Sequence, residues 1–210
     1  MDRPSKIVCI GRSFRQHAVE LGNEIPKEPI YFLKATTALI GPGEPIVLPA
    51  VSREVHHEAE VALVIGDRMR HADPGDALTG VAAWTVLNDV TARDLQRADK
   101  GRFTRAKGFD TFCPLSDVRL PDLQWAQARI QCYVNGDLRQ DDVLSNLMFT
   151  PGQILAAVTR CMTLLPGDIV SLGTPAGVGA LLAGDVVEVR LISGEGDPLA
   201  SLINPVQSTR

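Results

Sequence analysis

The sequence lacks several features that would assign the chain to a common class. Its 210 residues include four cysteines, yet there is no C-x-x-C pair and no cysteine beside a histidine at zinc-ligand spacing. No apolar run approaches membrane-spanning length, and residues 1–5 contain no apolar signal core. We therefore expect a cytoplasmic protein with reduced thiols, in which Cys9 and Cys132 are buried within apolar runs.

Clustered positive charge is also missing. The formal net charge is -4, and the densest basic stretch, from Lys100 to Lys107, is short and interrupted by Phe103. These properties argue against a protein that binds nucleic acid. The glycine-rich run at residues 173–179 matches neither G-x-G-x-x-G nor a Walker sequence, so it is no nucleotide-binding fingerprint.

The sequence does contain many short apolar segments separated by turns. Segments rich in branched and aromatic residues predict strands, and helical spacing or a proline at the first position predicts helices. No βαβ alternation is sustained, so we predict one α+β, mainly β domain over residues 1–210, with a frayed tail after Asn204. The expected strands are 6–11, 30–33, 46–48, 56–66, 84–89, 130–134, 168–172, 185–191 and 199–203, and the expected helices are 15–21, 91–98 and 151–162.

Two glutamates on one expected strand are candidate metal ligands. Glu58 and Glu60 are two residues apart, so their carboxylates project from the same face. Such carboxylates repel each other unless a cation neutralises them, and Mg²⁺ and Ca²⁺ prefer oxygen ligands. Asp89, at the polar end of another apolar strand, would be the third carboxylate. The alternative is a solvated strand edge, although Ala62 and Val64 continue the same face and make it less polar.

A histidine and a glutamate on the first expected helix are candidate catalytic residues. His17 and Glu20 are three apart, which places them on one helix face. A carboxylate beside an imidazole orients it as a general base for water. Lys107 would stabilise a developing oxyanion. The alternatives are a surface ion pair for the first two residues and an exposed side chain for the lysine.

Three further residues are candidate substrate contacts. Arg93 and Gln96, one helical turn apart, would face the same cavity as Asp89. The run that contains Thr174 would let the backbone approach a ligand closely, and the hydroxyl would donate to a carboxylate. The alternatives are a solvated helix side and an ordinary tight turn.

The candidate segments follow one another in a recognisable order. Together they resemble the fumarylacetoacetate hydrolase family, and within it the short acylpyruvase or fumarylpyruvate hydrolase-like members. The order is specific although each motif alone is modest. The segments are Gly-Arg-x-aromatic-x-x-His-x-x-Glu at 11–20, Phe-Leu-Lys at 32–34, His-Glu-Ala-Glu-Val-Ala-Leu-Val-Ile-Gly at 57–66, Asn-Asp-Val-Thr-Ala-Arg-Asp at 88–94, Lys-Gly-Phe-Asp at 107–110 and Gly-Thr-Pro-Ala-Gly-Val-Gly at 173–179.

The resemblance implies a mixed β-sandwich roll, a homodimer, a small 2-oxo acid substrate and a Mg²⁺ or Mn²⁺ ion, with Ca²⁺ as a possible non-native occupant. It also implies a lid helix that carries the catalytic pair. The family often has Asn-Tyr where this chain has Ser13-Phe14, which removes two polar groups near that pair. The implied roles are metal ligands for Glu58, Glu60 and Asp89, catalysis for His17, Glu20 and Lys107, and substrate binding for Arg12, Gln96 and Thr174.

The predicted function is hydrolysis of a carbon–carbon bond in an acylpyruvate, which yields pyruvate and a carboxylic acid. Two alternatives use the same metal–enolate chemistry, namely decarboxylation of oxaloacetate and isomerisation of an unsaturated 2-oxo diacid. A third alternative is a non-catalytic module that binds an oxo acid. His17 with Glu20 favours hydrolysis, because an isomerase needs no activated water.

Overall fold

The computed structural model describes residues 3–20, 22 and 24–209. Strands make up most of the regular structure in this part of the chain, and its four α-helices are short. The elements are β1 (Ile7–Gly11), α1 (Arg15–Glu20), β2 (Ile30–Lys34), β3 (Leu39–Ile40), β4 (Ile46–Leu48), β5 (Val55–His56), β6 (Ala59–Ile65), β7 (Val81–Asn88), β8 (Thr91–Ala92), α2 (Arg93–Ala98), α3 (Thr104–Lys107), β9 (Cys113–Pro114), β10 (Arg129–Val134), β11 (Asp137–Val143), α4 (Pro151–Cys161), β12 (Ile169–Ser171), β13 (Val186–Ile192) and β14 (Pro198–Ser208).

Two five-stranded sheets contain most of these strands. The first sheet has the order β2-β1-β12-β6-β7, and the second has the order β11-β10-β13-β14-β4. Most neighbouring strands are antiparallel, while β1 runs parallel to β12, β14 to β4, and β3 to β9. The predicted α+β, mainly β class with few short helices is therefore confirmed.

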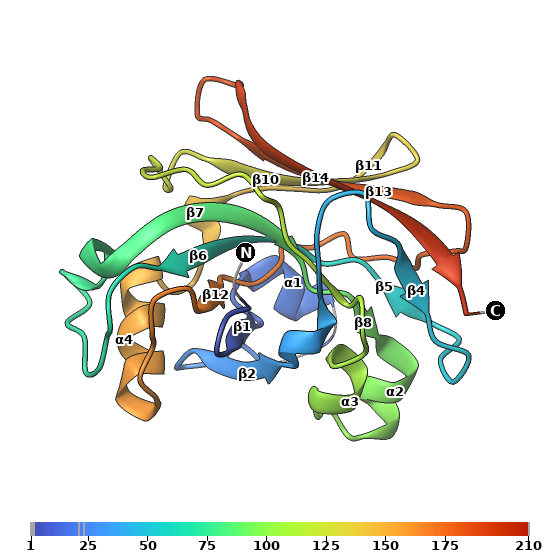
Figure 1. Ribbon diagram of the computed structural model, residues 1–210, viewed down its shortest axis with the longest axis horizontal. Helices are drawn as coiled ribbons and strands as arrows, with labels where there is room; N and C mark the ends of the chain where they lie inside the picture. The colour runs from blue at the N-terminus through green and yellow to red at the C-terminus, as the bar shows by residue number, and fades with distance from the viewer. Residues whose placement is uncertain (1–2, 21, 23, 210) are drawn as a thin grey trace.

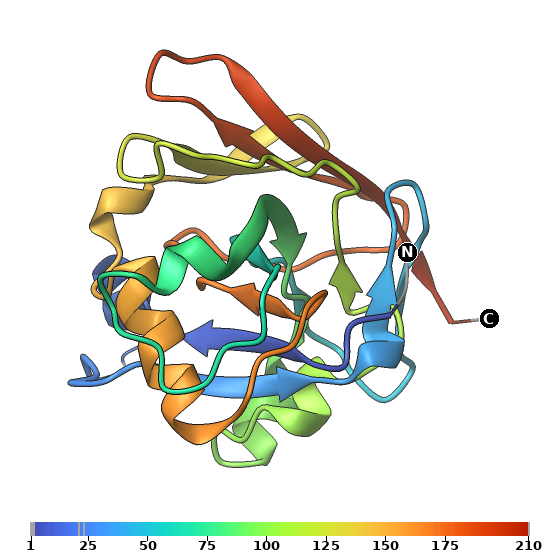
Figure 2. The ribbon, with the colours of Figure 1, turned by 60° about the vertical axis from the view of Figure 1, so that its left-hand side comes forward.

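The two sheets are stacked. In Figure 1, β10, β11, β13 and β14 lie above β6 and β7, while α2 and α3 lie below β8. The turned view in Figure 2 shows β1, β2 and α4 on the far side from the red and yellow strands of the second sheet. Within the stack, β10 and β13 pack against β6, and β13 and β14 pack against β7.

Strand β6 is buried on both faces. Val61, Leu63 and Ile65 belong to the large core between the sheets, whereas Ala62 belongs to a second, smaller apolar cluster on the opposite face. The predicted alternation is therefore confirmed. The predicted bounds of 56–66 were wrong, because β5 pairs with β8 and leaves a break before β6 begins at Ala59.

The three predicted helices are present and differ from the prediction only at their ends, whereas α3 was not predicted. Helix α1 covers Arg15–Glu20, and position 21 of the predicted helix lies outside the described residues. Helix α2 begins at Arg93 instead of 91, because β8 is paired with β5. Helix α4 starts at Pro151 behind a Thr150 capping box, which satisfies backbone N–H groups of the first turn.

The end of the chain differs from the prediction. The tail after Asn204 was expected to fray, but β14 continues to Ser208 and pairs in parallel with β4. Val206 is buried there, so apolar burial holds this segment in addition to the strand hydrogen bonds. Asn135 and Gly136 form the turn between β10 and β11, and both have the positive φ that a type I′ hairpin turn requires.

The cysteines are free thiols. Cys9, Cys113 and Cys132 are buried, as expected for the first and third, and Cys161 is exposed. Among the described residues no helix has the length and apolarity needed to cross a membrane.

Candidate active site

A cavity of about 420 Å³ opens beside the first sheet. Its walls come from the end of β1, helices α1, α2 and α3, strand β2, the start of β6 and the loop after β12. The volume is within the range typical of small-molecule sites. The lining side chains are both aromatic and charged, so the cavity offers apolar contact and ion pairing together.

The structure brings the residues predicted from the sequence to this one place. Asp89 does not line the cavity but lies buried just behind Lys107. The roles of these residues stay predictions, while their proximity is a structural finding. The predicted residues that line the cavity are Arg12, His17, Glu20, Glu58, Glu60, Arg93, Gln96, Lys107 and Thr174.

Two buried carboxylates, Glu58 and Asp89, pair with three buried cations at the base of the cavity, and the buried Glu60 lies beside Asp89. Lys107 Nζ lies 2.6 Å from a Glu58 oxygen and 2.5 Å from an Asp89 oxygen. The other Asp89 oxygen accepts a hydrogen bond from Lys34 Nζ at 2.6 Å. Arg93 donates to the remaining Glu58 oxygen. The network compensates charges that burial would otherwise make costly.

Burial and neighbouring charges shift the pKa values of this network in opposite directions. Burial, reinforced by Asp89 and Glu58, raises the pKa of Glu60 well above its ordinary value. For Glu58, burial would raise the pKa, but Arg93 and Lys107 outweigh it and lower the pKa. Burial would also lower the pKa of Lys107, but Asp89 and Glu58 raise it instead. Lys107 therefore stays charged, and Glu60 is the carboxylate that most needs a further cation.

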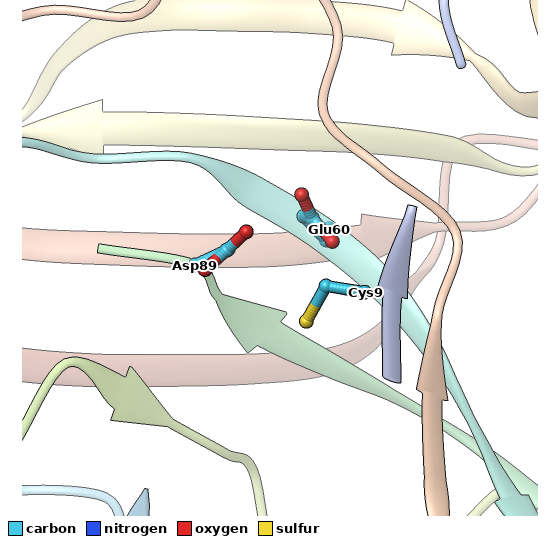
Figure 3. A group of neighbouring side chains, drawn as sticks. All are labelled: Cys9, Glu60 and Asp89. Carbon is cyan, nitrogen blue, oxygen red and sulfur yellow. The ribbon is translucent and has the colours of Figure 1, made fainter. Parts of the chain in front are cut away.

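Glu60 belongs to a close group of possible metal ligands. Figure 3 shows Glu60 on β6, Asp89 after β7 and Cys9 on β1 pointing toward one another, and one ligand atom from each lies within 4.8 Å of the other two. Burial raises the pKa of the Cys9 thiol well above its ordinary value, so it stays protonated and is a poor ligand. The carboxylate oxygens fit a hard divalent cation such as Mg²⁺ or Mn²⁺.

Glu58 is not part of that close group, although it was predicted as a ligand. It shares Lys107 with Asp89, so the ammonium group lies between the two carboxylates. Glu60 itself accepts hydrogen bonds from the Ser171 hydroxyl and, at 3.2 Å, from the Gly173 backbone N–H. A cation bound by Glu58, Glu60 and Asp89 together would therefore compete with the lysine for oxygen atoms.

The predicted pair on α1 is present. His17 Nδ1 lies 3.2 Å from Glu20 Oε2, and the other Glu20 oxygen accepts from the Gly177 backbone N–H at 3.0 Å. Burial lowers the pKa of His17, against the opposing effects of Glu58 and Glu20. The imidazole is therefore largely neutral near pH 7, which is the form that accepts a proton.

The remaining predicted substrate contacts differ in whether their side chains already have hydrogen-bond partners within the protein. The Thr174 hydroxyl donates to the Ala59 carbonyl at 2.9 Å, so it is already engaged. Gln96 accepts from Arg93 at 2.9 Å. Arg12 has a φ of 57°, in the left-handed region that arginine rarely adopts, and lines the cavity. Such local strain is common where a side chain must be aimed at a functional site.

Sequence reasoning missed the role of Lys34 and of two aromatic rings. Phe32 and Lys34 share one face of β2, and Phe32 stacks on Phe103 with ring centroids 4.4 Å apart. Lys107 Nζ lies 4.9 Å from the centre of the Phe32 ring. Leu33, between them in sequence, is half exposed, so period-two alternation was the signal that marked Phe32 and Lys34 as inward.

The departure at Ser13-Phe14 lies away from the cavity. Both residues are buried, and neither is among the lining side chains. In the described part of the chain the Ser13 hydroxyl has no hydrogen-bond partner, and a Cβ on Gly173 would lie only 1.9 Å from it. The substitution therefore affects packing behind the site rather than the cavity wall.

Known proteins resemble this chain along nearly its whole length. The sequence profile of the family described as "Fumarylacetoacetate (FAA) hydrolase C-terminal" matches residues 6–207. The mitochondrial oxaloacetate tautomerase of Xenopus laevis is 38% identical and covers 97% of this chain and 66% of its own length.

Solved structures also resemble this chain along nearly its whole length. A structure named 5-carboxymethyl-2-hydroxymuconate delta-isomerase, from Mycobacterium smegmatis, has a TM-score of 0.90 at 41% identity, over 99% of this chain and 80% of that one. The fumarylacetoacetate hydrolase of Exiguobacterium antarcticum has a TM-score of 0.87 at 33% identity, over 99% of this chain and 77% of that one.

Proposed function

This chain belongs to the fumarylacetoacetate hydrolase family, and we propose that it is a divalent-metal-dependent hydrolase of acylpyruvates. The substrate is a 2,4-dioxo acid, and the products are pyruvate and a carboxylic acid. Members of this family are enzymes, and a solved relative from Exiguobacterium antarcticum is named as a hydrolase. The reaction, the metal and the residue roles given below are our proposal for this chain.

The observation that carries the proposal is the placement of the pair on α1. His17 is buried, its pKa is lowered, and Glu20 holds its ring at 3.2 Å beside a cavity lined by Glu58 and Glu60. A neutral histidine oriented by a carboxylate is suited to activate water. An isomerase needs a base for a proton on carbon, but it needs no activated water.

The chain's own residues would act as follows. A Mg²⁺ or Mn²⁺ ion held by Glu58, Glu60 and Asp89 would polarise the 2-oxo acid and stabilise its enolate form. His17 accepts a proton from water, whose oxygen forms a bond to the distal carbonyl carbon, while Lys107 offsets charge on that carbonyl oxygen. The carbon–carbon bond then breaks. Its electron pair goes to the pyruvyl carbon, which takes up the proton from His17.

The charge balance favours an anionic substrate. Glu58 and Asp89 pair with three cations and Glu60 adds a third carboxylate beside them, so a bound divalent ion leaves an excess of positive charge. A 2-oxo acid supplies the compensating negative charge. Arg12 lines the cavity and forms no ion pair with another described residue, so it would contact a second anionic group of the substrate.

A second candidate is tautomerisation or isomerisation of a 2-oxo diacid. The relatives from Xenopus laevis and Mycobacterium smegmatis are named as a tautomerase and an isomerase. Buried carboxylates with Lys107 beside them suffice for enolisation without activated water. In that reaction no water is activated and no pyruvate is released, and this difference separates the two candidates.

The test follows the ultraviolet absorbance of the enol forms of acetylpyruvate and fumarylpyruvate with Mg²⁺ and, as control, with EDTA. Pyruvate is measured at the same time by coupling to its reduction. We expect metal-dependent loss of the enol signal with stoichiometric pyruvate. Loss of the oxaloacetate enol signal without pyruvate would favour the tautomerase, and oxaloacetate converted to pyruvate above the metal-only background would favour decarboxylation.

His17→Ala tests the carrying observation directly. We expect cleavage to fall by about 10²- to 10⁴-fold, the usual contribution of a general base, with Mg²⁺ affinity retained. Gln16→Ala, on the exposed side of the same helix, is the matched control and should leave the rate unchanged. Full activity in His17→Ala would refute the role of the pair. No turnover of any of these oxo acids by the native protein would favour the binding module.

A further inference from the structure

One buried glutamine belongs to a strand whose other residues are largely exposed. Gln140 lies on β11, at the edge of the second sheet, and none of its surface is exposed. It does not line the cavity, and the proposed reaction does not use it. A fully buried amide must find hydrogen-bond partners, because an unpaired one would be costly.

A β-bulge turns this side chain inward. Cys132 and Tyr133 are neighbours on β10, but they pair with Gln140 and Leu138, which leaves Arg139 unpaired. In a regular strand Leu138 and Gln140 would share a face. Here Leu138 is 50% exposed and Gln140 is 0% exposed, so the bulge has placed them on opposite faces. Bulges often re-aim a side chain in this way next to functional sites.

All hydrogen-bonding positions of the Gln140 amide are directed at segments that build the cavity. Its oxygen accepts from the Ala59 backbone N–H at 3.0 Å, at the start of the strand that carries Glu60. The same oxygen lies 3.0 Å from Nδ1 of His57, the residue before Glu58. Its nitrogen donates to the Thr174 hydroxyl at 2.7 Å and to the Pro175 carbonyl at 2.9 Å. One amide thus joins two walls of the cavity that are more than a hundred residues apart.

The backbone of β11 also supports the loop at residues 173–179. A Cβ on Gly177 would lie 2.1 Å from the Arg139 carbonyl oxygen, so the loop rests directly against the bulge. The Gly177 N–H is the group that binds Glu20, and the Gly173 N–H binds Glu60. The position of this loop therefore sets the position of both carboxylates.

We infer that Gln140 is a positioning residue for the reaction, although it lies on the opposite sheet and touches no substrate. It fixes the loop at 173–179 against β6, and through Gly177 it fixes Glu20 beside His17. This inference rests on the proposed function for its kinetic effect. Its structural part concerns the loop and α1 alone.

The experiment compares Gln140→Met, which removes both amide groups, with Gln140→Glu, which keeps an oxygen for Ala59 but removes the donor to Thr174. Gln131→Met, on neighbouring β10 and without contact to the loop, is the matched control. Hydrogen exchange of peptides covering 15–20 and 173–179 is measured without substrate. Urea unfolding, kcat, KM and the pH profile are measured in parallel.

We expect faster exchange in both peptides for both Gln140 variants and no change for Gln131→Met. The value of kcat should fall by about 10- to 100-fold with a smaller change in KM, since a displacement near 1 Å at a catalytic group has that effect. The acid limb of the pH profile should move to lower pH, because Glu20 no longer raises the pKa of His17 as strongly.

Two results would overturn the inference. One is unchanged exchange at 15–20 and 173–179 in folded variants, and the other is a fall in urea stability with unaltered kcat and pH profile. If Gln140→Met does not fold, Gln140→Glu gives the answer. If the native protein cleaves no acylpyruvate, the proposed function fails, and the exchange measurement still decides whether Gln140 fixes the loop.

Discussion

The two five-stranded sheets differ in whether one face or both faces are buried. Strand β13 of the second sheet alternates between buried and partly exposed residues, so that sheet has one dry face and one wet face. Strands β1, β6 and β12 of the first sheet are buried on nearly every residue, because apolar clusters cover both faces. Charged groups on the first sheet must therefore pair within the protein, and the candidate site is where they do.

The largest expected effect comes from removing one charge on the first sheet, which is buried on both faces. Glu60→Ala leaves two carboxylates against three cations and removes a proposed metal ligand. We expect Mg²⁺ affinity, measured by calorimetry, to fall by more than about 100-fold, since loss of an outer partner of a ligand alone typically has a 10- to 100-fold effect.

Glu188→Ala, on the wetter face of β13, is the control for this measurement and should leave the affinity unaltered. An unchanged affinity in Glu60→Ala would remove this residue from the ligand set.

A smaller effect on activity is expected at the edge of the same site. Glu20 raises the pKa of His17, although burial dominates and the net shift is downward. In Glu20→Gln the pKa of His17 should fall further. Because the proposed base is active when neutral, the acid limb of the kcat/KM profile should then move to lower pH, with a reduced plateau rate. A limb that stays in place or moves to higher pH would show that Glu20 does not act on His17.

On the second sheet, a core substitution should change stability and not chemistry. Leu191 on β13 is fully buried between the sheets. Leu191→Ala should lower the free energy of unfolding in urea by about 2–5 kcal/mol through lost burial and a residual cavity. The kcat at a temperature where the variant is folded should match that of the native protein. A large loss of kcat in the folded variant would mean that the two sheets are not separable in this way.

The smallest effect on stability is expected on the solvent-exposed face of the second sheet. Arg129 and Asp141 form an ion pair at 2.8 Å between β10 and β11, with 42% and 30% of their side chains exposed. Arg129→Ala should lower the free energy of unfolding by only about 0.2–1 kcal/mol, the range for exposed pairs, and less at high salt. A loss as large as that of Leu191→Ala would contradict the one-sided character of this sheet.

Features whose cause lies in residues adjacent in the sequence were predictable from the sequence. The alternation in β13, the Asn135-Gly136 turn and the proline at the start of α4 each have a local cause. The continuation of β14 was missed because its partner β4 lies more than 150 residues away. No local pattern reports a pairing at that separation.

In the candidate site, too, local motifs were predictable from the sequence and contacts between distant segments were not. Motifs in a recognisable order identified the residues that meet in the cavity, including His17 and Glu60. Lys34 belonged to one of these motifs, but its role was missed, and Phe103 was not identified, because their contacts with Asp89 and Phe32 arise only from folding. Gln140 was missed for a sharper reason, since a one-residue bulge reverses the face that its position in the strand would predict.

The parallel pairings also constrain how the protein is made. Residues 7–9 pair with 169–171, and residues 46–48 pair with 206–208. During synthesis the first sheet cannot form completely until residue 171 has left the ribosome, and the second cannot form completely until residue 208 has. Contacts of such high sequence separation slow folding and leave strand edges open in the meantime. We therefore expect nascent chains that stop before Val206 to be inactive and prone to aggregation, even though every proposed catalytic residue has already been synthesised.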